Sequence, residues 1–375
     1  MSGLAAPQGN ELAEFQEALQ HVYGPFGEAV ASEDAAQKWT PAPLEEGHRG
    51  RYLWTDAFGV LNFLTLHMLT SEPHYLTFAH RLIETVHSVL GRTRDGTSFL
   101  PGASESAPLS GGLRIGKREE HGPDGDGQYH HYLTLWMFAL NRYSVAAADP
   151  HYNSLGIQLA RAIHPAFVTG RGTDRPRIYW KVSMDLSRPL VPSQGNLDPF
   201  DGYVIFKLLD EHKMSGEEGL EKEIEDYRKI VQENWRRYHS EDPLDLGMSL
   251  WTAHWRLEEE WARHMKEAAV DSLRQLEQNG EFDVDPGHRI AFREFGSVMG
   301  IKCYDDLIAQ DYWHYWIAKL LAGWRKVGLV PTPKRGSAAL RSVNVQLKAI
   351  TEVMFCAALI PGAFRKGWVE AHMKR

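Results

Sequence analysis

Residues 52–90 read YLWTDAFGVLNFLTLHMLTSEPHYLTFAHRLIETVHSVL, in which two periodic apolar segments flank a proline. Apolar side chains at positions 53, 57, 60, 61, 64 and 68 follow the period of an α-helix, so we predict a helix over Leu53–Thr70. Pro73 restarts the chain, and Gly91 ends a second helical segment over Leu76–Leu90. The sequence therefore predicts two antiparallel helices joined by a short turn.

The same arrangement occurs again 77 residues further along the chain. The tripeptide Pro73–Tyr75 recurs as Pro150–Tyr152, between predicted helices over Gln128–Ala147 and His151–Val168. Self-similarity at a fixed spacing is typical of proteins built from repeated units. We interpret the unit as a helical hairpin, and we expect successive hairpins to form a ring around a central cavity.

Three further hairpins are predicted from the same periodic signals, over 198–238, 246–278 and 290–326. The N-terminal helix 10–22 is expected to pair with the last apolar helix, 338–359, which closes the ring end to end. This gives six hairpins. No segment has the composition of a linker, so we predict a single all-α domain over 1–375.

Two connections between hairpins are long and rich in Gly, Pro and Ser, namely 93–127 and 170–197. Loops of this length are uncommon in compact domains unless they build a functional site. Within the second loop, Arg177–Met184 mixes β-branched and aromatic residues and predicts a short strand. We therefore expect the two loops to contribute binding residues.

The composition excludes several classes of protein. The formal net charge is −8 over 375 residues, and no run of Lys and Arg indicates a nucleic-acid partner. No apolar stretch has the length of a membrane span, and the N-terminus lacks the pattern of a secretory signal. Cys303 and Cys356 are the only cysteines, which favours a reducing, cytoplasmic location. Twelve Trp and fourteen Tyr favour a cavity lined by amphipathic rings.

Two motifs at predicted helix starts resemble a known superfamily. Leu53–Gly59 reads LWTDAFG, and Asp198–Tyr203 reads DPFDGY. The first is similar to the Trp-x-Asp segment that carries an active-site aspartate in the unsaturated-glucuronyl hydrolases. With its paired helices and long loops, the chain resembles, over residues 50–360, the six-hairpin, or (α/α)6-toroid, glycosidase superfamily, which also includes N-acetylglucosamine 2-epimerase-like isomerases. The resemblance implies an (α/α)6 toroid and a carbohydrate-active enzyme.

Three carboxylates near inner-helix starts are candidate catalytic groups. Asp56 lies one turn into the first inner helix, where the helix dipole favours an anion, although it can equally cap the helix or pair with Arg51. Glycoside hydrolysis needs two carboxyl groups about 5–9.5 Å apart. We expect Asp198 to be an N-cap, which makes Asp201 the preferred partner of Asp56, with Glu294 as a third candidate.

The adjacent residues His130 and His131 are candidates for proton transfer. Neighbouring helix positions point about 100° apart, so we expect one imidazole to face the cavity and the other to pack outward. We assign catalysis to His131 and substrate binding to His130; a buried, hydrogen-bonded histidine is the alternative reading. The preceding run Asp124–Gly127 resembles the opening of a calcium loop, but Leu135 stands where the bidentate Glu belongs. We predict no metal and no cofactor, because no motif for either is present.

Aromatic and basic residues near these groups are candidate substrate ligands. Rings stack on the apolar faces of sugars, while Lys and Arg bind hydroxyls or a carboxylate. The alternatives are core packing for residues on helices and a solvated surface for residues in loops. The predicted substrate-binding residues are Trp54, Tyr129, His130, Trp180, Lys181, Arg188, Tyr203 and Trp251.

The sequence thus leads to three functional hypotheses. The first is a glycoside hydrolase that acts on a short saccharide, neutral or acidic, with two carboxylates as acid and base. The second is a sugar epimerase or isomerase that uses a cavity histidine. The third is a non-catalytic toroid that binds a sugar or another metabolite.

Overall fold

A computed structural model of the chain describes residues 9–122, 124–332 and 347–374. Its contacts divide into two compact units. We call Gly27–Trp235 with Val369–Arg375 the α3–α8 unit, and Met1–Phe26 with Arg236–Trp368 the α9–α14 unit. Each unit is described by itself.

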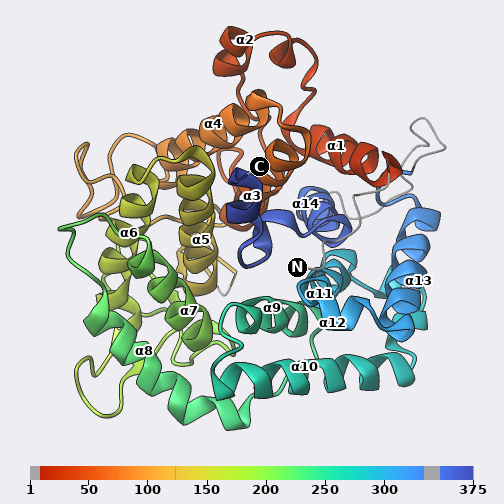
Figure 1. The fold of residues 1–375 in the computed structure, drawn as a ribbon. Helices are drawn as coiled ribbons and strands as arrows, with labels where there is room; N and C mark the ends of the chain where they lie inside the picture. Colours follow the sequence, from red (N-terminus) through yellow and green to blue (C-terminus); the bar gives the residue numbers. More distant parts are fainter. Residues whose placement is uncertain (1–8, 123, 333–346, 375) are drawn as a thin grey trace. The chain divides into compact units, whose positions relative to one another are not determined.

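Three helix pairs form the α3–α8 unit (Figure 1). They are α3 (Leu53–Thr70) with α4 (Pro73–Leu90), α5 (His130–Ala147) with α6 (His151–Phe167), and α7 (Asp198–Glu211) with α8 (Glu221–Asn234). The first helices of the pairs contact one another in the order α3, α5, α7, and most of their residues are buried. The short elements are η1 (Gly27–Val30), α2 (Glu33–Lys38), η2 (Trp235–Arg237, which continues into the other unit) and α15 (Trp368–Met373).

Short strands fasten the 170–197 loop to two helix ends. β1 (Gln128–Tyr129) pairs antiparallel with β4 (Lys181–Val182), so Tyr129 lies opposite Lys181. β2 (Val168–Thr169) pairs with β3 (Arg177–Ile178). The single strand predicted over 177–184 is therefore two strands with different partners, one at the start of α5 and one at the end of α6.

The α9–α14 unit also contains three helix pairs. They are α9 (Pro243–His254) with α10 (Glu260–Gln278), α11 (Ala291–Lys302) with α13 (Asp311–Val327), and α14 (Lys348–Leu359) with α1 (Gly9–Tyr23). The short helices are α12 (Asp305–Ile308), η3 (Glu281–Asp283), η4 (Pro286–His288) and η6 (Gly362–Phe364). α11 contacts both α9 and α14.

The structure confirms the predicted helix pairs, with three in each unit, and corrects some of their limits. Asp198 is the first residue of α7, not its N-cap, which is Leu197. The predicted helix 338–359 is observed from Lys348 as α14, and its earlier part lies outside the described residues. That α1 and α14 close a ring, and that 1–375 is one domain, remain predictions.

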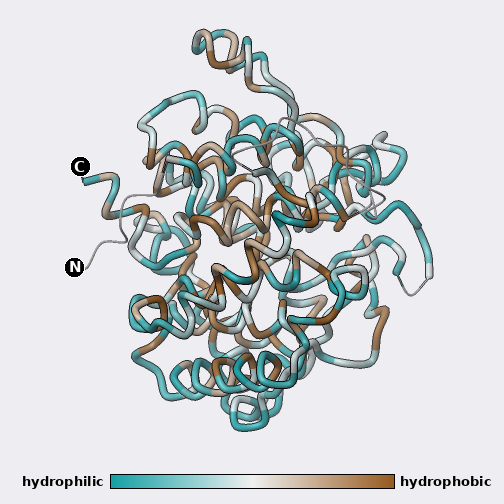
Figure 2. Tube along the Cα trace, turned by 90° about the vertical axis from the view of Figure 1, so that its right-hand side faces the viewer, coloured by the Kyte–Doolittle hydropathy of each residue, from teal (hydrophilic) through white to brown (hydrophobic). Residues whose placement is uncertain are grey.

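Burial follows the sequence patterns of the helices. Residues 53–66 of α3 are all buried, so the whole circumference of this part of the helix is covered, and its apolar side chains are not confined to one face. The second helices of the pairs are amphipathic, and in Figure 2 hydrophilic and hydrophobic turns alternate along single helices. Within the described ranges, no helix is both long and apolar enough to span a membrane.

A close approach of two backbones in the α9–α14 unit gives a stability prediction. A Cβ atom at Gly247 of α9 would overlap the Gly296 carbonyl of α11, and one at Gly300 would overlap the Gly247 carbonyl. Gly247→Ala must therefore push the helices apart, and we expect it to lower the free energy of unfolding by about 1–3 kcal/mol. The matched control is Gly323→Ala on α13, where a Cβ meets nothing within 4 Å. In urea titrations this control should be neutral or stabilising by up to about 1 kcal/mol; equal effects of the two changes would contradict the close approach.

Candidate active site

Aromatic side chains of the α3–α8 unit gather at the N-terminal ends of α3 and α5. The hydroxyls of Tyr52 and Tyr132 are 2.6 Å apart, and their rings meet edge to face at 5.6 Å between centroids. The ring of Trp54 lies 5.3 Å from that of Tyr132 and 5.8 Å from the imidazole of His131. Side chains from two neighbouring inner helices therefore share one packed surface.

The 170–197 loop extends this surface. The Tyr129 ring contacts the rings of Tyr132 at 5.3 Å and Trp180 at 5.1 Å. The Lys181 ammonium lies 5.0 Å from the centroid of the Tyr129 ring, and burial lowers the pKa of this lysine. The six residues that we call the aromatic cluster are Tyr52, Trp54, Tyr129, His131, Tyr132 and Trp180. Five residues predicted from the sequence thus lie together: Trp54, Tyr129, His131, Trp180 and Lys181.

The two adjacent histidines at the start of α5 have different environments. His130 is fully buried, with Nε2 2.7 Å from the Tyr227 hydroxyl and Nδ1 3.1 Å from Oδ1 of Asp198. His131 is 35% exposed, and its Nδ1 lies 3.7 Å from the same carboxylate oxygen. Because neighbouring helix positions point in different directions, one imidazole is buried and the other is partly exposed, as expected. His130 thus has the buried, hydrogen-bonded arrangement given above as the alternative reading, while His131 is partly open to solvent.

Asp198 links the two histidines and is not the helix cap predicted for it. Burial opposes ionisation of this carboxyl, but hydrogen bonding and charge from His130 and His131 outweigh that effect and hold its pKa below the usual range. Gly195 leaves room for the carboxylate, because a Cβ at that position would overlap Oδ2 of Asp198. The 170–197 loop therefore packs directly on Asp198, the carboxylate that both histidines contact.

Asp56 has the contacts of the capping and ion-pairing alternative that the sequence left open. Its side chain is 0% exposed, accepts the backbone N–H of Tyr52 at 3.3 Å and lies 3.5 Å from Nη1 of Arg51. The guanidinium of Arg51 also donates to the carbonyls of Ala42 and Gly50. These contacts hold the loop before α3 against the first turn of the helix, and they favour capping and ion pairing over catalysis.

The other predicted residues of the α3–α8 unit are Asp201, Tyr203 and Arg188, and the cluster member Trp180 also has a contact within its own loop. Asp201 is buried in the first turn of α7, and the Tyr203 hydroxyl of the same helix accepts a hydrogen bond of 3.2 Å from Lys207. Trp180 donates its indole N–H to the Ser193 hydroxyl at 3.2 Å. Arg188 is exposed in the same loop, which agrees with the solvated-surface alternative for that residue.

Two predicted residues belong to the α9–α14 unit. Glu294 is buried and accepts 2.6 and 2.5 Å hydrogen bonds from Arg289 and a 2.7 Å bond from the indole of Trp324. Trp251 is buried and donates its indole N–H to the carbonyl of Phe364 at 3.1 Å. These contacts are typical of structural side chains, because the carboxylate is fully engaged with fixed donors.

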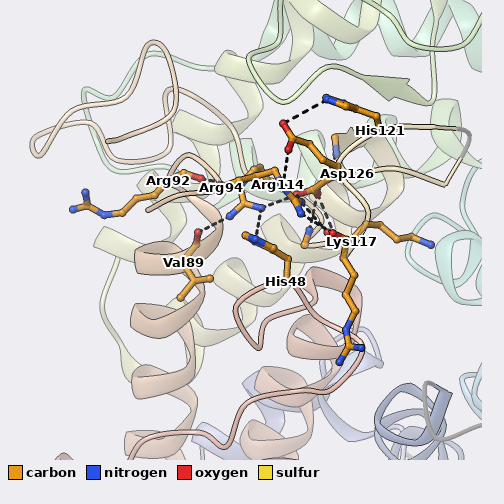
Figure 3. A network of polar contacts seen from close by, with 12 residues as sticks. His48, Val89, Arg92, Arg94, Arg114, Lys117, His121 and Asp126 are labelled. Atoms are coloured by element: carbon orange, nitrogen blue, oxygen red, sulfur yellow. Dashed lines mark hydrogen bonds and ion pairs between the residues drawn. The ribbon is translucent and has the colours of Figure 1, made fainter. Parts of the chain in front are cut away.

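A network of polar contacts centred on Asp126 ties the 93–127 loop together (Figure 3). Lys117 of this loop has its ammonium 6.0 Å from the centroid of the Tyr52 ring, which belongs to the aromatic cluster. Oδ2 of Asp126 accepts 2.6 Å hydrogen bonds from both Arg94 and Arg114, and its Oδ1 accepts the backbone N–H groups of Gly116, Lys117 and Gly127. Arg114 is 0% exposed. The Asp124–Gly127 run, which resembles the opening of a calcium loop in the sequence, thus contains the anchor of a buried ion-pair network.

Several contributors were not predicted. Gln128 joins the two long loops: its amide donates to the carbonyls of Gly111 and Met184 at 2.9 and 2.8 Å and accepts from the N–H of Leu113 at 2.9 Å. No signal in a single sequence marks such a glutamine. Tyr132 is different, because the run Tyr129–Tyr132 at a helix start already indicates an aromatic surface. Glu46, in the loop before α3, was also missed.

The similarities between this chain and known proteins are found by comparing three-dimensional structures. No protein-family model and no curated protein sequence matches the chain. A sugar epimerase from a ruminal bacterium is similar with a TM-score of 0.53 at 9% identity, covering 92% of this chain and 98% of its own. A glycoside hydrolase family 76 mannosidase from Bacteroides thetaiotaomicron is similar with a TM-score of 0.54 at 10% identity, and the match covers 94% of this chain and 98% of the mannosidase. The cellobiose 2-epimerase from Spirochaeta thermophila is similar with a TM-score of 0.52 at 13% identity, and the match covers 92% of this chain and 96% of the epimerase.

These likenesses show the class of fold. The chain has the all-α architecture of the (α/α)6-toroid superfamily that its sequence resembles. At identities of 9–13% they identify no particular family within it.

Proposed function

We propose that this protein is a sugar epimerase or isomerase in which His131 moves a proton at the carbon next to the sugar carbonyl. The observation that carries the proposal is the pair of histidines beside Asp198, of which His130 is buried and His131 is 35% exposed among aromatic rings. A half-exposed imidazole backed by a carboxylate is the usual arrangement of a general base. Two of the similar solved structures are named as epimerases, which supports this class of reaction.

In this reaction His131 takes the proton from C2 of the open-chain sugar, and the electron pair of that C–H bond forms an enediolate with the carbonyl. The imidazolium of His131 returns the proton to C1 to give the ketose. Alternatively, rotation about the C2–C3 bond turns the other face of C2 toward His131, and return of the proton to that face gives the epimer. Asp198 contacts Nδ1, so it orients the ring with Nε2 toward the sugar and stabilises the imidazolium. Tyr132 and Trp180, which are only partly buried and both contact the Tyr129 ring, supply surfaces on which the sugar can stack.

Glycoside hydrolysis, the first hypothesis from the sequence, is the second candidate. It is favoured by the presence of Asp56 and Asp201 in the first turns of two inner helices of the same unit. Both side chains are buried, and Asp56 is already held by Arg51 and a backbone N–H. The partly exposed base is therefore the better explanation of the site.

The test is incubation of the protein with glucose, mannose, fructose and cellobiose in deuterated water, followed by proton NMR. We expect the C2 proton signal to disappear as the epimer or ketose forms, because a carbon-bound proton exchanges with solvent through the histidine. Release of glucose from cellobiose without deuterium at carbon would instead establish hydrolysis. Binding of these sugars without any turnover would favour the non-catalytic alternative and would also overturn the proposal.

A further inference from the structure

The loop before α3 has a constrained backbone and presents one carboxyl group toward the first turn of that helix. Arg49 and Gly50 both have positive φ, 55° and 76°, a conformation that is strained for the arginine. A Cβ at Gly47 would overlap the backbone of Arg51, so the turn between them is tight. The loop is also fixed to the 93–127 loop, since the N–H of His48 donates to the Gly116 carbonyl at 2.7 Å.

This constrained turn holds Glu46 beside the aromatic cluster. Its Oε1 lies 3.5 Å from the Thr55 hydroxyl, and its charge acts on the phenol of Tyr52, a member of the aromatic cluster. Glu46 is half-buried, so one part of the side chain remains open to a ligand. The neighbouring Asp56 carboxylate is fully buried, which leaves Glu46 as the accessible carboxyl at this helix start.

We propose that Glu46 is a second catalytic residue of this site, the acid that protonates the sugar carbonyl oxygen while His131 removes the C2 proton. The inference rests on the proposed function. The electron pair of the C2–H bond becomes part of the C1–C2 double bond of a neutral enediol. The Glu46 O–H bond breaks as its proton passes to the carbonyl oxygen, and Glu46 is left as a carboxylate. The reverse transfer restores it, so no further reactant is needed.

The charges around Glu46 support an acid that is protonated near neutral pH. Burial raises its pKa to about 7, and the Asp56 carboxylate adds to that shift, whereas hydrogen bonds from its own backbone and Thr55 and the charge of Arg51 oppose it. The Tyr52 phenol is a further titratable group close enough to interact with it. A carboxyl with such a pKa is suited to general acid catalysis at neutral pH.

The test compares Glu46→Gln with Glu45→Gln, a change at the adjacent exposed residue. We expect Glu46→Gln to lower kcat by about 100- to 10,000-fold. In the wild type, kcat should fall above a pH of about 7 as Glu46 loses its proton, and the residual kcat of Glu46→Gln should not show this fall. Glu45→Gln should keep both the rate and the pH profile of the wild type. Unchanged kcat and pH profile in Glu46→Gln would overturn the inference.

A second measurement does not depend on turnover. Because the pKa of Glu46 is raised in the folded protein, the native state binds more protons than the unfolded state between pH 4.5 and about 7. The difference in the free energy of unfolding between the wild type and Glu46→Gln should therefore fall as pH rises through this window. Urea titrations of both proteins at each pH measure this difference. A flat difference would reject the neutral acid even if the enzyme is active. If the slope is present but no sugar is isomerised, the proposed function fails, and the catalytic role of Glu46 fails with it.

Discussion

His131→Asn is expected to lower kcat for sugar epimerisation or isomerisation by about 100- to 10,000-fold, because the amide cannot accept the C2 proton. Substrate binding should change little, since asparagine keeps a polar group of similar size among the rings of the aromatic cluster. The loss should therefore appear in kcat more than in KM. Steady-state kinetics with the preferred sugar and deuterium exchange at C2 measure it.

Two variants separate a catalytic role of His131 from a structural one. His121→Asn changes a histidine of the same unit that is 86% exposed, and it should keep wild-type kcat. Asp198→Asn removes the carboxylate that orients His131, and we expect a smaller but clear fall in kcat with a changed pH profile. If His131→Asn exchanges the C2 proton at the wild-type rate, His131 is not the base.

Asp126→Ala is expected to lower the free energy of unfolding by about 3–5 kcal/mol, which is the usual effect of removing one partner of a buried ion pair. The change leaves Arg114, which is 0% exposed, without its carboxylate, and it removes the acceptor of three backbone N–H groups. Because Asp126 holds the 93–127 loop beside the aromatic cluster, activity should fall together with stability. Urea titration and thermal unfolding measure the first effect.

The matched control is Asp124→Asn, two residues away and exposed. It removes a charge from the same loop without opening the buried network, so the free energy of unfolding should change by less than about 0.5 kcal/mol. Arg94→Ala, which removes one of the two arginines that contact Asp126, should give an intermediate loss. Asp126→Ala with the stability of the wild type would show that the network does not hold the loop.

The helices could be predicted from the sequence because their signals are local. The limits of α3 were predicted correctly, since this helix has a regular apolar period and a clear start and end. Asp198 shows where local rules fail. An aspartate before a proline is typical of an N-cap, yet its carboxylate faces two histidines on another inner helix, a long-range contact that the local sequence does not reveal.

The candidate site was predictable in part for the same reason. Trp54, Tyr129 and His131 stand at the starts of inner helices, so a repeated-hairpin interpretation brings them near one another before any coordinates are known. Gln128 contributes through contacts between loops, and the role that we propose for Glu46 depends on its burial. Neither property can be predicted from the periodicity of the sequence. Their roles depend on how two long loops pack, and the sequence gives only the length of those loops.

The most direct test is a crystal structure of the protein with mannitol, an acyclic analogue of the open-chain sugar. The predicted result is mannitol against the partly buried rings of Tyr132 and Trp180, with C2 about 3–3.5 Å from an imidazole nitrogen of His131. Mannitol bound away from the N-terminal ends of α3 and α5, with no contact to His131, would contradict the proposed base and the site built around it.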